Sequence, residues 1–288
     1  MLSLRQLAHT ASRRSCQSLQ YALAVKTFSS TSIQHSYALY DVDNDDEPNY
    51  HPRRNKMPNP GLMFVGSRVL DTKKTSDEKY NRFYNEEHLP DVLNYGMCKV
   101  AMRYKNVNTS SPMPYIALYP LDDASILESP KLGSLVEDTT MSKTFDNSDI
   151  YEHIHFDLRT YEKIQTFEGY GNADKSGEDR GKTIVCVAME PAKGQDQDFD
   201  DWYRKQHLDM LSMCRGFLRS TRYKKLNGEK PRYLALHEYA CNADELPADQ
   251  VKQVVATEWT QKILKEGRAY ERDVFELVQV QGDGSLQL

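Results

Sequence analysis

The chain passes through the same order of apolar runs and amphipathic stretches twice. In the first half, runs of apolar residues predict strands, and capped stretches with apolar positions three and four apart predict helices. The expected strands are 62–69, 100–104, 115–119 and one within 151–166, and the expected helices are 77–89 and about 123–143. Pro90 is expected to end the first helix, because proline disfavours helix continuation.

The second half repeats this order. Its expected strands are 183–189, 218–224, 233–239 and 274–280, and its expected helices are 198–213 and 247–266. Each half therefore reads β-α-β-β-α-β, an order that a four-stranded antiparallel sheet backed by two helices satisfies. Consecutive apolar residues, such as those from Ile184 to Val187, indicate strands covered on both faces. We predict an α+β fold of two ferredoxin-like modules whose sheets cover each other.

A duplicated motif supports this division. The first half contains Phe83-Tyr84-Asn85-Glu86-Glu87-His88-Leu89, followed by Arg103-Tyr104-Lys105. Its counterpart 119 positions later is Trp202-Tyr203-Arg204-Lys205-Gln206-His207-Leu208, followed by Arg222-Tyr223-Lys224. Two patterns that keep the same spacing indicate a duplicated module.

Outside the modules the chain changes character. Residues 1–34 are basic, rich in Ser and Thr and free of acids, which is typical of a mitochondrial presequence. The alternative is a tail without an address, and a cytoplasmic protein. The expected division is a presequence at 1–34, an acidic and Pro-rich linker at 35–60, module one at 61–168, a linker at 169–181, module two at 182–281 and a tail at 282–288.

Composition excludes several classes of function. The formal charge of −5 and pI near 5.9 argue against a nucleic-acid partner. Five cysteines without a Cys-x-x-Cys pair indicate neither a disulfide framework nor a zinc knuckle, and fit a reducing compartment. No apolar run is long enough for a membrane span.

With these motifs the chain resembles the dimeric α/β-barrel superfamily, and within it the EthD-type proteins and their fungal relatives. Their pattern of an aromatic residue, Tyr and His-Leu-Pro is matched by the segment from Phe83 to Pro90, whereas Asp209 replaces the proline in the second copy. The resemblance covers about residues 61–281. It implies a barrel that two chains normally form together, so this tandem chain is expected to build it alone, as a monomeric pseudo-dimer.

His88 and His207 are the leading candidates for catalysis, because imidazole moves protons near neutral pH. Tyr84 and Tyr203 lie one turn earlier and could polarise a substrate oxygen. The alternative is that these aromatic residues only pack the helix against the sheet.

Other polar residues have weaker patterns. Arg103 and Arg222 could bind a substrate carboxylate, or could pair with Glu87 or another acid. Asp91 and Asp209 could orient the histidines, or could lie in solvent. For the remaining candidates the expectations are a solvated strand at His153 and His155 rather than a metal site, a structural role for His237, and buried thiols at Cys98 and Cys214.

The favoured hypothesis is a cofactor-independent enzyme acting on a small oxygenated organic molecule through a His–Tyr pair. The resemblance implies a cyclase, dehydratase, decarboxylase or monooxygenase type of reaction. The alternatives are a non-catalytic module that holds a small hydrophobic ligand or haem, and a structural pseudo-dimer without a site.

Overall fold

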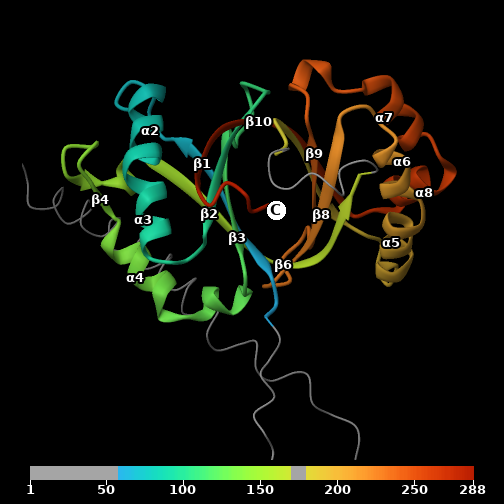
Figure 1. The fold of residues 1–288 in the computed structure, drawn as a ribbon, viewed down its shortest axis with the longest axis horizontal. Helices are drawn as coiled ribbons and strands as arrows, with labels where there is room; N and C mark the ends of the chain where they lie inside the picture. Colours follow the sequence, from blue (N-terminus) through green and yellow to red (C-terminus); the bar gives the residue numbers. More distant parts are fainter. Residues whose placement is uncertain (1–57, 170–179) are drawn as a thin grey trace, which may run out of the picture.

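The computed structural model describes residues 58–169 and 180–288, and its elements fall into two halves (Figure 1). The first half comprises β1 (Gly61–Val69), α2 (Asp77–Phe83), the π-helical turn η1 (Tyr84–His88), α3 (Leu89–Asn94), β2 (Val100–Asn106), β3 (Tyr115–Leu121), the 3-10 turn η2 (Ala124–Glu128), α4 (Pro130–Asp138), β4 (Met141–Ser142), β5 (Ser148–Asp149), the 3-10 turn η3 (Ile150–Glu152) and β6 (Ile154–Glu168). The second half comprises β7 (Thr183–Glu190), α5 (Asp196–Trp202), the π-helical turn η4 (Tyr203–His207), α6 (Leu208–Ser212), β8 (Phe217–Lys225), β9 (Tyr233–Tyr239), the 3-10 turn η5 (Ala243–Glu245), α7 (Ala248–Val255), α8 (Glu258–Glu266) and β10 (Ala269–Gly282).

The large strands close into one antiparallel barrel with the order β1-β3-β2-β10-β7-β9-β8-β6. Each half contributes four neighbouring strands, and the halves join where β2 pairs with β10 and β6 pairs with β8. The strands β6 and β10 are the longest, at 15 and 14 residues, because each pairs within its own half and with the other. The prediction of two ferredoxin-like modules forming an intramolecular α/β barrel is confirmed.

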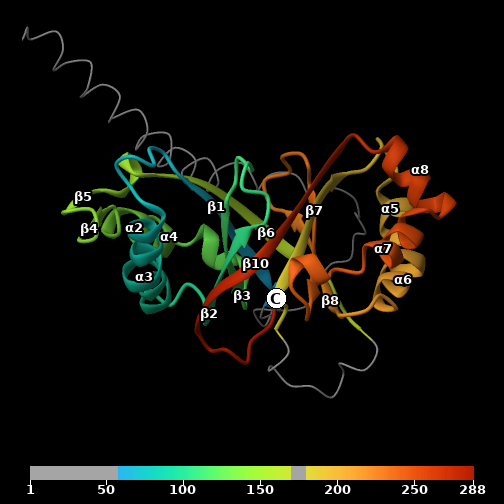
Figure 2. The same ribbon diagram turned by 90° about the horizontal axis from the view of Figure 1, so that it is seen from above.

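The helices lie on opposite outer sides of the barrel, as Figure 2 shows. Residues alternate along the strands between a core inside the barrel and a core beneath each set of helices. The inner core includes Phe64, Leu118, Ile184 and Leu236, each 2% exposed or less. Burying such a side chain contributes roughly 1.5–3 kcal/mol, so the shared interior holds the two halves together.

The C-terminal segment enters this interior. Leu288 is 2% exposed and packs in the inner core, while Arg219 donates a hydrogen bond of 2.6 Å to Gln287 Oε1. The residues expected to form a tail therefore cover one part of the barrel interior.

The first helix of each half contains a π-helical turn, which corrects the expected end at Pro90. The Leu89 N–H donates to the Tyr84 carbonyl five residues earlier, and the helix continues as α3 to Asn94. Pro90 lies in the first turn of α3, where a missing N–H costs little. The same turn forms before Asp209 in the second half, so proline is not its cause.

The second helical region differs between the halves. In the first half the stretch expected at about 123–143 is interrupted at Ser129, between η2 and α4, and Pro130 begins α4. In the second half the stretch expected at 247–266 is two helices, because the Thr257 side chain caps a new N-terminus by accepting from the Thr260 N–H. This pair of helices roofs the site described next.

The expected presequence at 1–34 and most of both expected linkers lie outside the described residues. Within residues 58–169 and 180–288, none of the helices has the length and apolar character that crossing a membrane requires.

Candidate functional site

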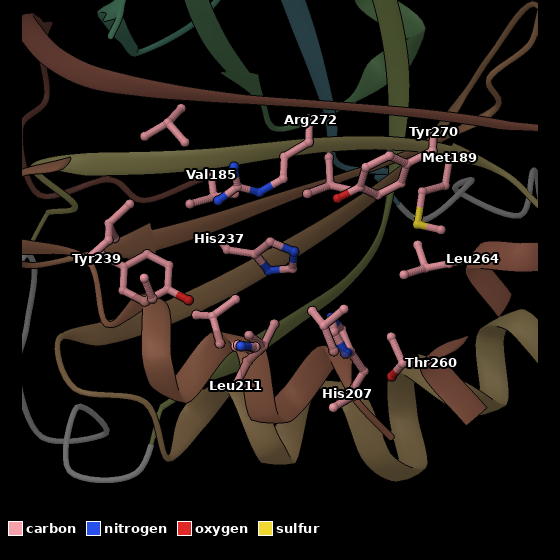
Figure 3. Close-up of a pocket in the computed structure, with 18 of the residues that line it drawn as sticks. Val185, Met189, His207, Leu211, His237, Tyr239, Thr260, Leu264, Tyr270 and Arg272 are labelled. Carbon is pink, nitrogen blue, oxygen red and sulfur yellow. The ribbon is translucent and has the colours of Figure 1, made fainter. Parts of the chain in front are cut away.

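A cavity of about 750 Å³ lies between the outer face of the second sheet and the helices that cover it. Strands β7, β9 and β10 form one wall, and η4, α6, α7 and α8 supply residues of the other. The lining is mainly apolar, with polar groups at His207, His237, Tyr270 and Arg272. Figure 3 shows His237 extending from the sheet and His207 from the helical side. Its size and lining are those of a small-molecule pocket.

The corresponding space in the first half is nearly filled, with a cavity of about 50 Å³. His88 borders it. The duplicated histidines therefore face very different volumes, and only His207 meets a cavity large enough for an organic ligand.

Strand register identifies sheet residues that differ between the two spaces. The duplicated arginines, Arg103 and Arg222, each lie opposite an alanine on the neighbouring strand. Two residues beyond that alanine, β3 carries Tyr119 and β9 carries His237. A large phenol in the first half is thus replaced by a smaller imidazole in the second.

The edge strands differ in the same way. On the strand at its other side, Ala117 in β3 pairs with Val65, and Ala235 in β9 pairs with Val187. Val65 in turn pairs with Leu158 in β6, and Val187 pairs with Arg272 in β10. Two residues earlier, Phe156 corresponds to Tyr270. Leu158 and Phe156 border the small cavity of the first half, whereas Tyr270 is 51% exposed beside the large one.

His207 is held by ring stacking. Its imidazole lies 4.2 Å from the Trp202 ring centroid at 28°, and the Trp202 indole N–H donates to Thr260 Oγ1 over 3.0 Å. Neither ring nitrogen has a hydrogen-bond partner within the described part of the chain, and Nδ1 is buried. Burial, with His237 and Arg222 nearby, lowers the pKa of His207 to about 3, so the ring is neutral at pH 7.

His237 faces His207 across 6.3 Å between ring centroids. Its Nδ1 shares a 2.5 Å hydrogen bond with the buried Ser220 hydroxyl, which leaves Nε2 as the nitrogen available to a ligand. Burial, followed by Arg272 and Arg222, lowers its pKa to about 3. The cavity therefore contains two neutral imidazoles from opposite walls.

Tyr203 also lines the cavity, but its hydroxyl has only a weak contact, 4.0 Å from the Met189 sulfur. Burial raises its pKa above the ordinary value, so the phenol stays protonated. In the first half the Tyr84 hydroxyl instead donates to Ser67 over 3.1 Å. Only the second tyrosine is free of a strong partner within residues 58–169 and 180–288.

The duplicated arginines are placed away from the cavity lining. Arg222 forms a 2.9 Å ion pair with Asp200 and lies 4.1 Å from the Tyr203 ring centroid. Arg103 donates to Asn81 and Asn85 and lies over the Tyr84 ring at 4.3 Å. Both guanidinium groups support the helix and the tyrosine ring in their own half. The acid considered as their partner, Glu87, accepts instead from residues 142–144.

The remaining sequence candidates have ordinary structural surroundings. No hydrogen bond joins Asp91 to His88, or Asp209 to His207, in the described chain. His153 bonds to the hydroxyls of Thr75 and Ser148. Among residues 58–169 and 180–288 no cluster of side chains could hold a metal ion. Cys98 and Cys214 are buried free thiols.

Sequence reasoning missed four residues that shape the site: Ser220, His237, Tyr270 and Arg272. The available signal was the difference between the halves, since the first half has Ala101, Tyr119, Phe156 and Leu158 at the corresponding places. The spacing of 119 residues aligns Ser220 with Ala101, but it misses the other three pairs, because loop lengths change the offset in later strands.

Comparisons with known proteins identify a relative by sequence and neighbours by structure. No protein-family model matches the chain. It is 27% identical over 212 residues to Core atranone cluster (CAC) protein 1 of Stachybotrys chlorohalonatus, covering 67% of this chain and 86% of that one.

Two solved structures share the architecture at low identity. An anthrone oxidase-like protein superposes with a TM-score of 0.52 at 13% identity, covering 80% of this chain and 95% of that chain. A mutant chlorite dismutase of Candidatus Nitrospira defluvii, in complex with cyanide, gives a TM-score of 0.51 at 8% identity, covering 76% and 91%. The chain therefore has the fold of the dimeric α/β-barrel superfamily, with both halves of the barrel supplied by one polypeptide.

Proposed function

We propose that the second half is the working half of a cofactor-independent, EthD-like enzyme that moves a proton on an apolar, oxygenated small molecule. The observation that carries this proposal is the unequal pair of cavities, about 750 Å³ beside His207 and about 50 Å³ beside His88. A structural duplication alone gives no reason for one half to retain a ligand-sized space with two histidines.

The two imidazoles suit complementary roles. His207 accepts a proton from an acidic C–H or O–H of the substrate, giving an imidazolium and an enolate. In the tautomer in which Ser220 donates to Nδ1, the His237 Nε2–H donates a hydrogen bond to the enolate oxygen. The negative charge formed beside His207 raises its pKa above that in the empty cavity, which favours the transfer.

Tyr203 adds a protonated phenol to the same wall and is proposed as a second donor to the oxygen. Arg222 acts through Tyr203, beneath whose ring it lies. The bond change that follows proton transfer, in a cyclisation, dehydration, decarboxylation or oxygenation, depends on the substrate.

Two relatives support this class of substrate. The name of the Stachybotrys relative associates that protein with the atranone cluster, and one structural neighbour is an anthrone oxidase-like protein. Anthrone is therefore a suitable probe, because its carbonyl makes the opposite ring carbon acidic and the carbanion is an aromatic enolate.

Proton transfer can be tested without knowing the natural substrate. Exchange of the acidic carbon-bound protons of anthrone in D₂O is followed by NMR, with and without protein. We expect catalysed exchange by the wild type and loss of catalysis in His207→Gln and His237→Gln, with melting temperatures nearly unchanged. No acceleration by the folded wild type contradicts the proposal and favours a binding module.

The haem alternative has a different requirement. An axial histidine normally donates its second N–H to an acceptor, and His207 has no such partner in the described part of the chain. His207 therefore does not fit haem ligation, whereas His237, whose Nδ1 is bonded to Ser220, meets this requirement. Mixing the protein with haemin is expected to leave the Soret band unshifted, and a shift that His237→Gln removes would favour the alternative.

We also propose import into the mitochondrial matrix, on the composition of residues 1–34. Fusing residues 1–45 to a fluorescent reporter tests this. Mitochondrial fluorescence is expected, and a diffuse cytosolic signal contradicts it.

A further inference from the structure

We propose that Arg272 forms, with His237, an anion-binding subsite at the mouth of the cavity. It selects ligands that combine an apolar, ring-sized body with one negatively charged oxygen. The inference rests on the proposed function in using the same cavity, but it concerns binding and not turnover.

Arg272 is placed on the cavity side of β10. It lies opposite Val187, which lines the cavity, and alternate residues Tyr270 and Val274 line it as well. Figure 3 shows its side chain near His237 on the sheet wall. The guanidinium is close enough to add to the lowering of the His237 pKa that burial causes, and to offset part of the rise that burial causes in the pKa of Tyr239.

This guanidinium has no ion pair within residues 58–169 and 180–288. Three more deeply buried arginines of the second half have one: Arg219 pairs with Glu238, Arg222 with Asp200, and Arg232 with Glu190. An unpaired guanidinium beside an apolar cavity offers several N–H donors to an oxyanion.

The other charges at the cavity favour the same sign of ligand. Its lining includes the cations Arg272 and Lys252 and one carboxylate, Asp244. The two histidines are neutral at pH 7, and the His237 Nε2 lies on the wall beside Arg272. The polar end of a ligand therefore meets a net positive charge and a neutral donor.

The rest of the lining favours an apolar body. Val185, Val187, Leu211, Val251 and Leu264 surround the space between Arg272 and the helices. In the first half Leu158 replaces the arginine, and the cavity is small. The arginine and the large cavity thus occur in the same half of the protein.

A matched pair of fluorescent probes tests the subsite. 1-Anilinonaphthalene-8-sulfonate and N-phenyl-1-naphthylamine share the same aromatic body and differ in the sulfonate. Both are titrated into the full-length wild type and into Arg272→Gln. We expect the variant to bind the sulfonate about tenfold more weakly, the scale of one lost charged hydrogen bond, and the neutral probe within twofold.

Salt and control variants sharpen the result. Added salt is expected to weaken sulfonate binding more in the wild type than in Arg272→Gln, which keeps only Lys252 as a cation at the cavity, because screening acts on charge contacts. Arg272→Lys keeps part of the preference, and Arg268→Gln, which removes a charge before β10, keeps all of it.

An equal effect of Arg272→Gln on both probes, or none on the sulfonate, overturns the inference. Failure of the wild type to bind either probe does so too. These outcomes are distinguishable from failure of the proposed function, because a protein that binds the sulfonate through Arg272 without exchanging anthrone protons keeps the subsite and loses only the catalytic role.

Discussion

At the scale of single residues, His237 owes its place in the site to its neighbours. Ser220 shares a hydrogen bond with its Nδ1. The corresponding residue of the first half is the larger Tyr119, so an imidazole at this position leaves more space beside the sheet. In the first half the residue corresponding to Ser220 is Ala101, which has no hydroxyl. The histidine and its serine therefore form a unit found in the second half.

Ser220→Ala tests that unit. Losing one hydrogen bond of about 1 kcal/mol is expected to slow anthrone proton exchange about fivefold. Binding of the neutral naphthylamine probe stays within twofold, and so reports an intact cavity. Exchange at the wild-type rate would show that Ser220 does not position His237 for the chemistry.

Arg222 and Arg272 are expected to contribute very unequally to stability. Arg222 is 2% exposed and paired with Asp200, so Arg222→Ala is expected to lower the free energy of unfolding by ~3 kcal/mol in urea titrations. Arg272→Ala, at an exposed position, changes it by less than about 0.5 kcal/mol. Equal stability of the two variants would contradict a structural role for Arg222 and return it to the substrate-binding candidates.

Sequence predicted part of the site at this scale. His207 and Tyr203 stood out because their motif is repeated, and both line the cavity. Arg222 belongs to the same repeat, but it forms an ion pair with Asp200 and packs against the Tyr203 ring, so it supports the helix and does not line the cavity. Arg272 and His237 lay outside the repeated motif, so repetition gave no reason to select them.

At the scale of elements, corresponding strands of the two halves carry different side chains toward the helices. Strands β3 and β6 present Tyr119, Phe156 and Leu158, whereas β9 and β10 present His237, Tyr270 and Arg272. The π-helical turn brings a histidine to both spaces equally. The sheets therefore contribute to the difference between the two spaces, together with the helical regions that cover them, α4 in the first half and α7 with α8 in the second.

Transferring first-half residues onto the second sheet tests this. The triple variant Ser220→Ala, His237→Tyr and Arg272→Leu is expected to narrow the cavity beside His207 and to weaken binding of the neutral probe, because a phenol is larger than an imidazole. Unchanged binding of the neutral probe would show that other residues maintain the space.

Element order was predictable, but the details of the helices were not. Hydrophobic spacing located the strands because each has a covered outer face and a barrel interior to fill. The π-helical turns left no sequence signal beyond the motif itself. The break between α7 and α8 depends on the N-cap at Thr257, which the spacing of hydrophobic residues does not reveal.

At the scale of the whole molecule, the shared barrel interior joins the two halves, whereas the helices that cover each sheet differ between the halves. The interior is shared, so its residues are constrained by both sheets. The outer layers pack mainly on the sheet of their own half, apart from contacts such as the hydrogen bond from Gln281 Nε2 in β10 to the Asn85 carbonyl, so one layer can fill while the other stays open. This explains why the duplicated sequence predicted the barrel well and the working half poorly.

Buried neutral histidines make the molecule sensitive to acid. The pKa values of His207 and His237 are about 3 in the folded chain and near 6.5 when unfolded. The unfolded chain thus binds more protons below pH 6.5, and stability falls as the pH falls from about 6.5 towards 3. At pH 5 each histidine is expected to cost ~2 kcal/mol relative to pH 8.

Urea unfolding between pH 8 and pH 5 measures this loss. The variant His237→Gln is expected to lose less stability over that range than the wild type, whereas His155→Gln, at an exposed position, loses the same amount. A free energy of unfolding that stays constant from pH 8 to pH 5 would contradict neutral burial of the two histidines.

The central claim is that one half of a duplicated fold performs proton transfer and the other does not. Anthrone proton exchange in His88→Gln and His207→Gln, compared under identical conditions, tests it most directly. We expect His88→Gln to exchange at the wild-type rate and His207→Gln to match the uncatalysed rate, with both proteins folded. Equal rates in the two variants, or loss of exchange in His88→Gln alone, would contradict the account.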